Sequence, residues 1–267
     1  MIKPLLPLTV GILTYNEEPN IAAALKSVVG WASEIIVVDS FSTDKTVDII
    51  NSFYNIKMYQ RAFFNHGDQK NWLIPKAKNE WILLLDADER VTSAMQSEIN
   101  NIIMEQAFSS EKVPVSGQFD AYWIGFTHYF MGQQVKYSGW QNDKTIRLIK
   151  RDLCRYNDNN VHEEIKMEGL RIGRLKAKFK HYTFRNIDHF IAKQAQYATW
   201  SAIDYAQKTG KITLFHLILK PFFRFFKHYF LKLGFLDGKA GLVISAVASW
   251  SVFLRYVKIL ENRRLKK

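Results

Sequence analysis

The sequence predicts an α/β protein, with a mostly parallel central sheet that is followed by a helical C-terminal region. Over roughly the first hundred residues, short apolar runs alternate with segments of helical periodicity, which is the order of repeated strand–helix units. The runs are apolar almost without interruption, as expected for parallel strands that are buried on both faces. After about Phe184 the pattern is helical to the end of the chain.

Each element in this order has its own sequence signal. Runs rich in Val, Ile and Leu predict strands over residues 8–13, 34–38 and 81–85, and a further strand is expected near residues 56–59. Helical spacing of apolar residues predicts helices over residues 21–28, from about residue 43, towards residue 75 and over residues 93–106. Ser93 and Gln96 form a capping-box pattern at the start of the last of these helices. Two later strands are predicted, an aromatic-rich one over residues 121–126 and another over residues 144–150.

Charge is divided unequally along the chain. Residues 1–150 contain 14 Lys and Arg against 16 Asp and Glu, whereas residues 151–267 contain 23 against 9. A nearly neutral part followed by a strongly basic part indicates an enzyme joined to a region that faces an anionic partner, either a membrane surface or a nucleic acid. The single cysteine, Cys154, cannot form an internal disulfide, which favours a reducing compartment. We interpret the N-terminal residues as a strand and not as a signal peptide.

Two carboxylates follow the predicted strand at residues 81–85. Asp86 and Asp88 are two positions apart, and side chains at that spacing in an extended chain point the same way. Adjacent anions repel each other unless a cation lies between them. Mg²⁺ or Mn²⁺ meets that need through oxygen ligands and keeps open positions for diphosphate oxygens. The pattern therefore predicts a divalent metal site, with helix capping by the two aspartates as the alternative.

Polar groups also follow the first two predicted strands. Asp39 ends the second strand, where its carboxylate could accept the imide N–H of a uracil, and Asn16 and Glu17 follow the first strand. Because the carboxyl ends of parallel strands meet at one edge of a sheet, three strands deliver polar groups to the same place. This convergence predicts a ligand site at that edge.

Four motifs in this order resemble the family 2 glycosyltransferases, which have the GT-A fold. They are Thr14-Tyr15-Asn16-Glu17, Val38-Asp39-Ser40, Gln69-Lys70-Asn71 and Leu85-Asp86-Ala87-Asp88-Glu89. Four later segments resemble the bacterial subgroup that includes lipopolysaccharide-core β-glucosyltransferases: Gly139-Trp140 with Arg147-Leu148-Ile149, Val161-His162-Glu163, His181-Tyr182 and Leu236-Asp237-Gly238-x-x-Gly241. We therefore expect a GT-A catalytic domain over residues 1–185 and a helical, basic, amphipathic membrane-associating region over residues 186–267.

The resemblance implies an inverting, metal-dependent hexosyltransferase with a UDP-sugar, usually UDP-glucose, as donor and Mg²⁺ or Mn²⁺ as cofactor. The residues that it implies around the nucleotide are Thr14, Tyr15, Asn16, Glu17, Asp39, Lys70 and Asp86. It places Asp39 at the base, Asp86 near the ribose or the metal, and Asp88 on the metal. Two interpretations of Lys70 remain: it contacts the donor phosphates, or it lies on the surface in contact with solvent. A bound cation would stabilise the charge on the leaving diphosphate without moving a proton.

Inversion also requires a general base that takes the proton from the acceptor hydroxyl. Family members commonly use an acid beyond the metal motif, and Glu163 is the residue we predict, with Glu164 and Asp143 as alternatives. His162 is either a further metal ligand or a histidine that only forms hydrogen bonds. Trp140 either stacks on a sugar or packs in the core. Arg147 is a candidate phosphate contact.

A basic, aromatic helix is predicted over residues 221–233. Its apolar face consists of Phe222, Phe225, Phe226, Tyr229, Phe230 and Leu233. Lys220, Arg224 and Lys227 occupy another face, so the helix can lie in an anionic membrane interface, with packing on the catalytic domain as the alternative. The next apolar run, residues 242–254, is shorter than the ~20 residues needed to span a bilayer. The expected location is cytoplasmic and peripheral, on the inner face of the cytoplasmic membrane.

Transfer of a hexose to a lipid-linked saccharide, such as lipopolysaccharide core, is the function that the resemblance favours. A polyprenyl-phosphate glycosyltransferase is the alternative within the same class, and such enzymes often carry transmembrane helices. A basic nucleic-acid-binding protein is the alternative from a different class. No nucleic acid is expected as a partner, because the basic residues share a helix with a phenylalanine stripe and no nucleic-acid-binding motif is recognised. An inactive scaffold is disfavoured by the intact acidic motifs.

Overall fold

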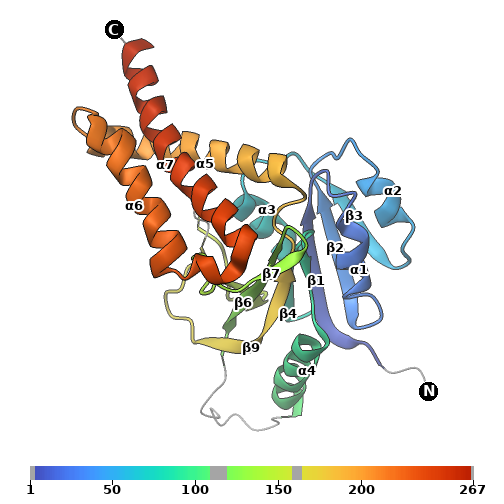
Figure 1. Ribbon diagram of the computed structural model, residues 1–267. Coiled ribbons are helices and arrows are strands. Elements are labelled where there is room, and N and C mark those ends of the chain that lie inside the picture. The colour runs from blue at the N-terminus through green and yellow to red at the C-terminus, as the bar shows by residue number, and fades with distance from the viewer. Residues whose placement is uncertain (1–3, 109–118, 158–163, 266–267) are drawn as a thin grey trace. The chain divides into compact units, whose positions relative to one another are not determined.

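The computed structural model describes residues 4–108, 119–157 and 164–265, and its centre is one twisted sheet (Figure 1). Four strands run parallel, in the order β3 (Ile56–Gln60), β2 (Ala32–Asp39), β1 (Leu6–Thr14) and β4 (Trp81–Asp86). The sheet continues with β8 (Lys144–Lys150), β6 (Ala121–Phe130), β9 (Ile172–His181) and β5 (Glu89–Arg90), and β7 (Gln133–Val135) pairs with β6. The strand β8 is antiparallel to both β4 and β6. The predicted parallel strands are therefore confirmed, and antiparallel strands extend them.

The register of the parallel strands aligns three of the predicted site residues. Thr14 of β1 lies opposite Asp39 of β2, and Leu13 lies opposite Asp86 of β4. The carboxyl ends of β2, β1 and β4 therefore coincide, as the sequence predicted.

The chain divides into two compact units, which we call the sheet unit and the helical unit. The sheet unit comprises Met1–Phe126 and Asp143–His181, and the helical unit comprises Thr127–Asn142 and Tyr182–Lys267. The domain boundary predicted at residue 185 stays a prediction, because compactness alone does not show that a segment folds independently.

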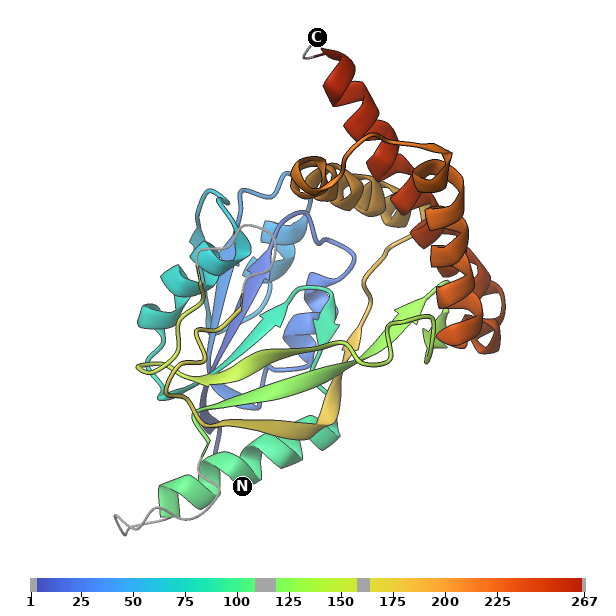
Figure 2. The ribbon, with the colours of Figure 1, turned by 90° about the vertical axis from the view of Figure 1, so that its left-hand side faces the viewer.

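Helices cover both faces of the sheet. The helices α1 (Ile21–Lys26), α2 (Thr46–Asn51) and α4 (Ser93–Phe108) pack on one face, and Figure 2 shows α4 running along the sheet next to β9. On the other face lies α3 (His66–Leu73), which continues into a 3₁₀ turn at Ile74–Lys76. The contact of α3 is close: a Cβ atom on Gly11 of β1 would lie 2.6 Å from Cδ2 of Leu73. A glycine at this position lets α3 approach the strand.

The start of α4 differs from the prediction by one residue. Thr92, not Ser93, is the N-cap, because its hydroxyl accepts a hydrogen bond from the backbone N–H of Met95 at 3.2 Å. The side chain of Gln96 donates instead to the carbonyl of Ser27 at 3.0 Å. The capping-box prediction is therefore wrong, since a tertiary contact with α1 takes the place of the local bond.

The helical unit consists mainly of α5 (Ile187–Lys208), α6 (Lys220–Phe226) and α7 (Gly238–Leu265), with α5 and α6 both packed against α7 (Figure 1). Asp237, at the start of α7, is buried. Its carboxylate accepts hydrogen bonds from the backbone N–H groups of Lys136 and Tyr137, at 2.9 and 3.0 Å, and from the Ser138 hydroxyl at 2.7 Å. The Asp237 segment therefore anchors the loop after β7 within this unit.

The predicted amphipathic helix has a different apolar surface from the one expected. π-helical turns at Phe215–Leu219 and Lys227–Leu231 flank α6. A π turn contains more residues than an α turn, so the 3.6-residue periodicity does not hold through these segments. Phe222, Phe226, Phe230 and Leu233 of the predicted face are exposed, but Phe225 and Tyr229 are half-buried, and their stacked ring centres are 5.4 Å apart. The other exposed apolar residues of this stretch are Leu214, Phe215, Ile218, Leu219, Phe223 and Leu231.

The apolar run at residues 242–254 lies inside α7, which has 28 residues. By length and composition alone, the segment Gly234–Leu265 is long and apolar enough to cross a membrane. The core helix of a globular protein passes the same test, and Ile244, Tyr256 and Ile259 of α7 are buried against the rest of the protein. The prediction that this run does not span stays a prediction.

Candidate active site

The end of β1 forms a tight polar loop with the segment after β2. Asn16 has a positive φ of 52°, and its side-chain oxygen accepts a hydrogen bond from the backbone N–H of Thr43 at 2.7 Å. The backbone N–H of Asn16 donates to the Ser42 hydroxyl at 2.8 Å, and that of Glu17 donates to the Thr46 hydroxyl at 2.8 Å. Hydrogen bonds therefore join the segment after β1 to the segment after β2, the two segments predicted to bind the nucleotide.

Asp39, the last residue of β2, is fully buried next to this loop. Its carboxylate accepts hydrogen bonds from the backbone N–H and the hydroxyl of Ser42, and from the side-chain amide of Gln60 at 3.2 Å. These bonds shape the loop around residues 39–42. Thr14 is buried beside Asp39, whereas the Tyr15 side chain is 57% exposed at the end of the strand. The roles predicted for these three residues at the base and nucleoside stay predictions.

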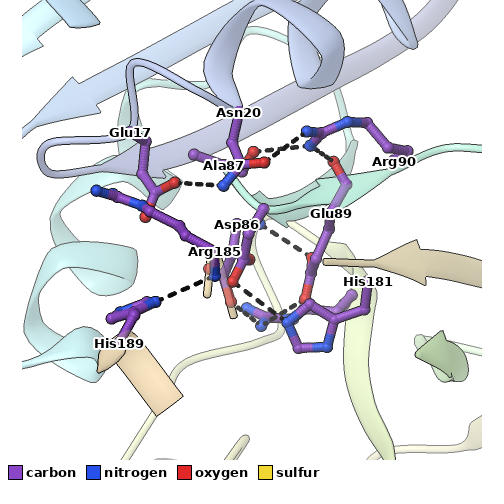
Figure 3. Close-up of polar contacts among 11 residues, drawn as sticks. Glu17, Asn20, Asp86, Ala87, Glu89, Arg90, His181, Arg185 and His189 are labelled. Carbon is purple, nitrogen blue, oxygen red and sulfur yellow. Dashed lines mark hydrogen bonds and ion pairs between the residues drawn. The ribbon is translucent and has the colours of Figure 1, made fainter. Parts of the chain in front are cut away.

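The acidic turn after β4 is held by an arginine from β8. Arg147 donates hydrogen bonds to the carboxylates of Asp86 and Glu89, the second at 3.4 Å. Glu89 in turn accepts from the backbone N–H of Asp86 at 3.0 Å (Figure 3). The guanidinium and the Glu89 side chain are almost inaccessible to solvent, so this ion pair lies in a low-dielectric environment. Arg147 was a candidate phosphate contact, and in this structure it contacts the turn.

Burial and the charge of Arg147 give the carboxyls of Asp86 and Glu89 different pKa values. Burial opposes ionisation of Asp86, but Arg147, Lys70, His66 and His181 outweigh it and hold the pKa of that carboxyl well below its usual range. Burial raises the pKa of Glu89, and the charges of Asp86 and Asp88 add to the effect of burial. The turn therefore carries an ionised Asp86 beside a glutamate that ionises less readily.

Asp88 of the same turn lies next to the last residue of β9. Its Oδ2 atom is 3.4 Å from Nε2 of His181 (Figure 3 shows this imidazole beside the turn). Burial opposes protonation of His181, but Asp88, Glu89 and Asp86 outweigh it and raise the pKa of the imidazole. His181 belongs to a motif that the sequence singled out, but it was given no role, and its strand was not predicted.

Whether the acidic turn holds a divalent cation stays a prediction, with Asp88 and His181 as the side chains that could supply ligands. Within the described ranges 4–108, 119–157 and 164–265, no group of three or more His, Cys, Asp or Glu side chains is arranged to hold a metal. Mg²⁺ and Mn²⁺ are commonly bound by one or two protein ligands together with substrate phosphates. Asp88 and His181 offer one oxygen and one nitrogen ligand close together, whereas Asp86 is already paired with Arg147.

Lys70 of α3 is buried, so the solvated surface position is wrong. Only 2% of the residue is exposed, and its ammonium group lies 4.8 Å from the centre of the Tyr156 ring. Its charge contributes to the low pKa of Asp86, which places it among the groups that act on the acidic turn. Whether it contacts donor phosphates stays a prediction.

The predicted general base, Glu163, lies outside the described residues, as does His162. The alternatives Glu164 and Asp143 are both exposed. The backbone of Glu164 pairs with Asn157, at 2.9 Å between the Asn157 N–H and the Glu164 carbonyl. Trp140 packs among the rings of Phe130, Phe184 and Phe190 in the helical unit, so packing in the core is the alternative that the structure favours.

Comparisons with known proteins find relatives of this chain among glycosyltransferases. The chain is 29% identical over 259 residues to an uncharacterized glycosyltransferase of Rickettsia typhi, a match that covers 94% of this chain and 85% of the relative. It is 25% identical to the lipopolysaccharide core biosynthesis glycosyltransferase LpsC of Rhizobium meliloti, covering 98% and 95% of the two chains. The structure of S. aureus TarS 1–349 in complex with UDP-GlcNAc has a TM-score of 0.49 and 17% identity, with 97% and 92% of the chains covered.

The profile of the family described as "Glycosyl transferase family 2" matches residues 9–157, which include β1 to β4, the acidic turn and Arg147. The predicted GT-A-like α/β fold and helical C-terminal region are confirmed. The chain belongs to family 2 of the glycosyltransferases.

Proposed function

We propose that the protein is an inverting hexosyltransferase that moves a hexose, with glucose as the first candidate, from a UDP-sugar to a lipid-linked saccharide such as lipopolysaccharide core. The observation that carries this proposal is the alignment of Thr14, Asp39 and Asp86 at coincident strand ends beside the acidic turn. The similarity to LpsC along almost the whole chain supports the acceptor class.

The nucleotide is proposed to bind at the polar loop and the acidic turn. Tyr15, Asn16, Glu17 and Asp39 would surround the nucleoside, because the exposed Tyr15 ring and the hydrogen-bonded loop after β2 lie at the same strand ends. Lys70 supplies a buried positive charge near Asp86, which supports a role towards the diphosphate.

Mg²⁺ or Mn²⁺ is proposed to be held by Asp88, with His181 as the neighbouring ligand and Asp86 paired with Arg147 behind it. When bound, the cation would stabilise the negative charge that develops on the departing diphosphate. The protein's own part is to fix the turn: Arg147 neutralises Asp86, and Glu89 holds the backbone of the turn.

Glu163 is proposed as the general base that takes the proton from the acceptor hydroxyl. The proposal rests on the family resemblance and on the position of this acid beyond the metal motif. Glu164 and Asp143, both exposed, remain the alternatives.

We also propose that the protein is cytoplasmic and binds the inner face of the cytoplasmic membrane through the stretch around α6. Exposed Phe222, Phe223 and Phe226 support it, as do the cations Arg224 and Lys227 on the same helical stretch. Lys220 does not belong to this cationic face, because its ammonium group donates to the Tyr256 hydroxyl of α7 at 2.9 Å.

The second candidate is a polyprenyl-phosphate glycosyltransferase. The length and composition of the segment Gly234–Leu265 favour it, because these enzymes often carry transmembrane helices. The two candidates differ in the acceptor, which is a saccharide hydroxyl in the first and a lipid phosphate in the second.

Purified protein incubated with UDP- and GDP-sugars tests the proposal, with a core oligosaccharide lipid and a polyprenyl phosphate as acceptors. We expect a glycosylated saccharide product that depends on a UDP-sugar. Product on the lipid phosphate would favour the second candidate. Salt-dependent DNA retention without sugar transfer would favour the nucleic-acid-binding class.

Sedimentation with anionic vesicles at low salt tests the membrane part. Wild type should sediment, and Arg224→Glu with Lys227→Glu should stay in the supernatant while still turning over a soluble acceptor. Arg174→Glu with Lys176→Glu, on exposed positions of β9, is the matched control and should sediment like wild type. Wild type that stays wholly in the supernatant would refute membrane binding.

A further inference from the structure

Arg90, for which the sequence predicted no role, also holds the turn that carries Asp88. The guanidinium of Arg90 donates hydrogen bonds to the carbonyls of Ala87 and Glu89, both at 2.8 Å. These two carbonyls flank Asp88, so the bonds fix the backbone on either side of the proposed metal ligand.

The same guanidinium reaches the N-terminus of α1. Its second terminal nitrogen donates to the side-chain oxygen of Asn20 at 3.0 Å, and the Asn20 amide donates to the Glu17 carboxylate at 2.7 Å (Figure 3). Asn20 is 9% exposed and Arg90 is half-buried, so these bonds are partly shielded from water. A continuous chain of hydrogen bonds therefore runs from the loop after β1 to the turn after β4.

A separate set of contacts joins the following residues to the other end of α1. The backbone N–H of Val91 donates to the Ser27 hydroxyl at 3.1 Å, and Gln96 donates to the Ser27 carbonyl at 3.0 Å. With these bonds in place, loss of the Arg90 side chain is expected to loosen the Asp88 turn locally and to leave the packing of α1 and α4 intact.

We propose that Arg90 is a positioning residue that locks the Asp88 turn to the Glu17–Asn20 segment, so that the donor nucleotide and the divalent cation bind cooperatively. This inference rests on the proposed function, which places the nucleoside at Glu17 and the cation at Asp88. A ligand that orders one segment orders the other through Arg90, which lowers the entropic cost of binding the second ligand.

Calorimetric titration of UDP, with and without saturating Mn²⁺, measures this coupling directly. In wild type, Mn²⁺ should strengthen UDP binding by about tenfold or more, within the usual range of coupling between sites. In Arg90→Ala the strengthening should fall severalfold but not vanish, because the cation would still contact the diphosphate directly, while UDP binding without metal stays within about twofold of wild type. If Arg90 had only a structural role, Arg90→Ala would instead bind UDP more weakly in the absence of metal and would have a lower melting temperature than wild type.

Asn20→Ala and the double variant complete a mutant cycle. If the two side chains act as one connection, the coupling in Asn20→Ala, Arg90→Ala and the double variant should be about equally low. Arg174→Ala, at an exposed arginine of β9, is the matched control and should keep the wild-type coupling.

The outcomes separate this inference from the proposed function. Metal-enhanced UDP binding that is unchanged in Arg90→Ala would overturn the role of Arg90 and leave the proposed function standing. Wild-type protein that binds no UDP, or binds it equally with and without Mn²⁺, would overturn the proposed nucleotide and metal site, and the coupling with it.

Discussion

The Nε2 atom of His181 lies 3.4 Å from Oδ2 of Asp88, which joins the end of β9 to the acidic turn after β4. The pairing of β5 with β9, in which Glu89 lies opposite His181, brings these two segments together. An imidazole beside a carboxylate can pair with it as a cation or act with it as a metal ligand.

His181→Ala should weaken binding of Mn²⁺ by about ten- to a hundredfold, as losing a ligand or its close neighbour commonly does. Titration of Mn²⁺ in the presence of UDP, followed by electron paramagnetic resonance, measures the affinity. Lys180→Ala, at the exposed preceding residue, is the control and should bind metal like wild type. Equal Mn²⁺ affinity in His181→Ala and wild type would remove His181 from the metal site.

Arg147→Met should lower the free energy of unfolding by about 3 kcal/mol, because it leaves the buried Glu89 and the neighbouring Asp86 without their cation. Urea unfolding of the purified protein measures the change. Adding Asp86→Asn should recover part of the loss, since Asp86 is the carboxyl of the turn that is ionised. A double variant no more stable than Arg147→Met would show that the charge of Asp86 is not the source of the cost.

The sequence predicted the parallel part of the sheet and the position of the site because each signal is local. Asp39 and Asp86 follow continuous apolar runs, and parallel strands must end at a common edge. The contact of Arg147 with Asp86 is not local, since the antiparallel register of β4 and β8, with Leu148 opposite Leu83, brings the two residues together. No spacing in the sequence specifies that register.

The strand β9 was missed although its sequence contains the signal. In Ile172–His181, buried Leu175 and Phe179 alternate with exposed basic residues, which is the period of a half-buried strand. Recognising this alternation would have placed His181 at a strand end, beside the acidic turn. The exposed face around α6 could not be predicted from helical periodicity, because the π-helical turns before and after α6 shift the side chains from the positions of a regular α-helix.

Glu163→Gln should lower kcat by ~10²-fold or more while the Kd for UDP stays unchanged, since a general base acts only on the acceptor proton. Steady-state kinetics with a soluble acceptor, together with UDP titration, measure the two quantities. Glu164→Gln and Asp143→Asn are the matched comparisons. If one of them loses activity and Glu163→Gln does not, the base is that residue.

The titration of His228, in the helical unit, should make the free energy of unfolding depend on pH. Its Nδ1 atom lies 3.0 Å from the carbonyl of Ser138. Burial lowers the pKa of the imidazole from 6.5 to about 4, and the neighbouring cations Arg224, Lys227 and Lys232 contribute to the shift. Between these two values the unfolded chain binds a proton that the folded protein does not. The free energy of unfolding should therefore be highest above pH 6.5 and fall as the pH decreases towards 4.

Melting temperatures of wild type and His228→Gln, measured between pH 7 and pH 4.5, test this linkage. The decrease on acidification should be smaller in the variant, because glutamine does not titrate and can still donate to the Ser138 carbonyl. Parallel curves for the two proteins would show that His228 does not contribute to the pH dependence.

UDP release from a UDP-sugar by wild type and Asp88→Asn, with Mn²⁺ and with chelator, measures whether Asp88 holds a cation that catalysis requires. Asp88 lies in the turn after β4 and not in either hydrophobic cluster of the sheet unit, so Asp88→Asn should fold like wild type. We expect wild-type turnover that chelator abolishes and Mn²⁺ restores, and a kcat about 10²-fold lower or more in Asp88→Asn, as expected for several kcal/mol of lost charge stabilisation. Near-wild-type turnover by Asp88→Asn, or by wild type in chelator, would show that Asp88 does not hold a catalytic cation.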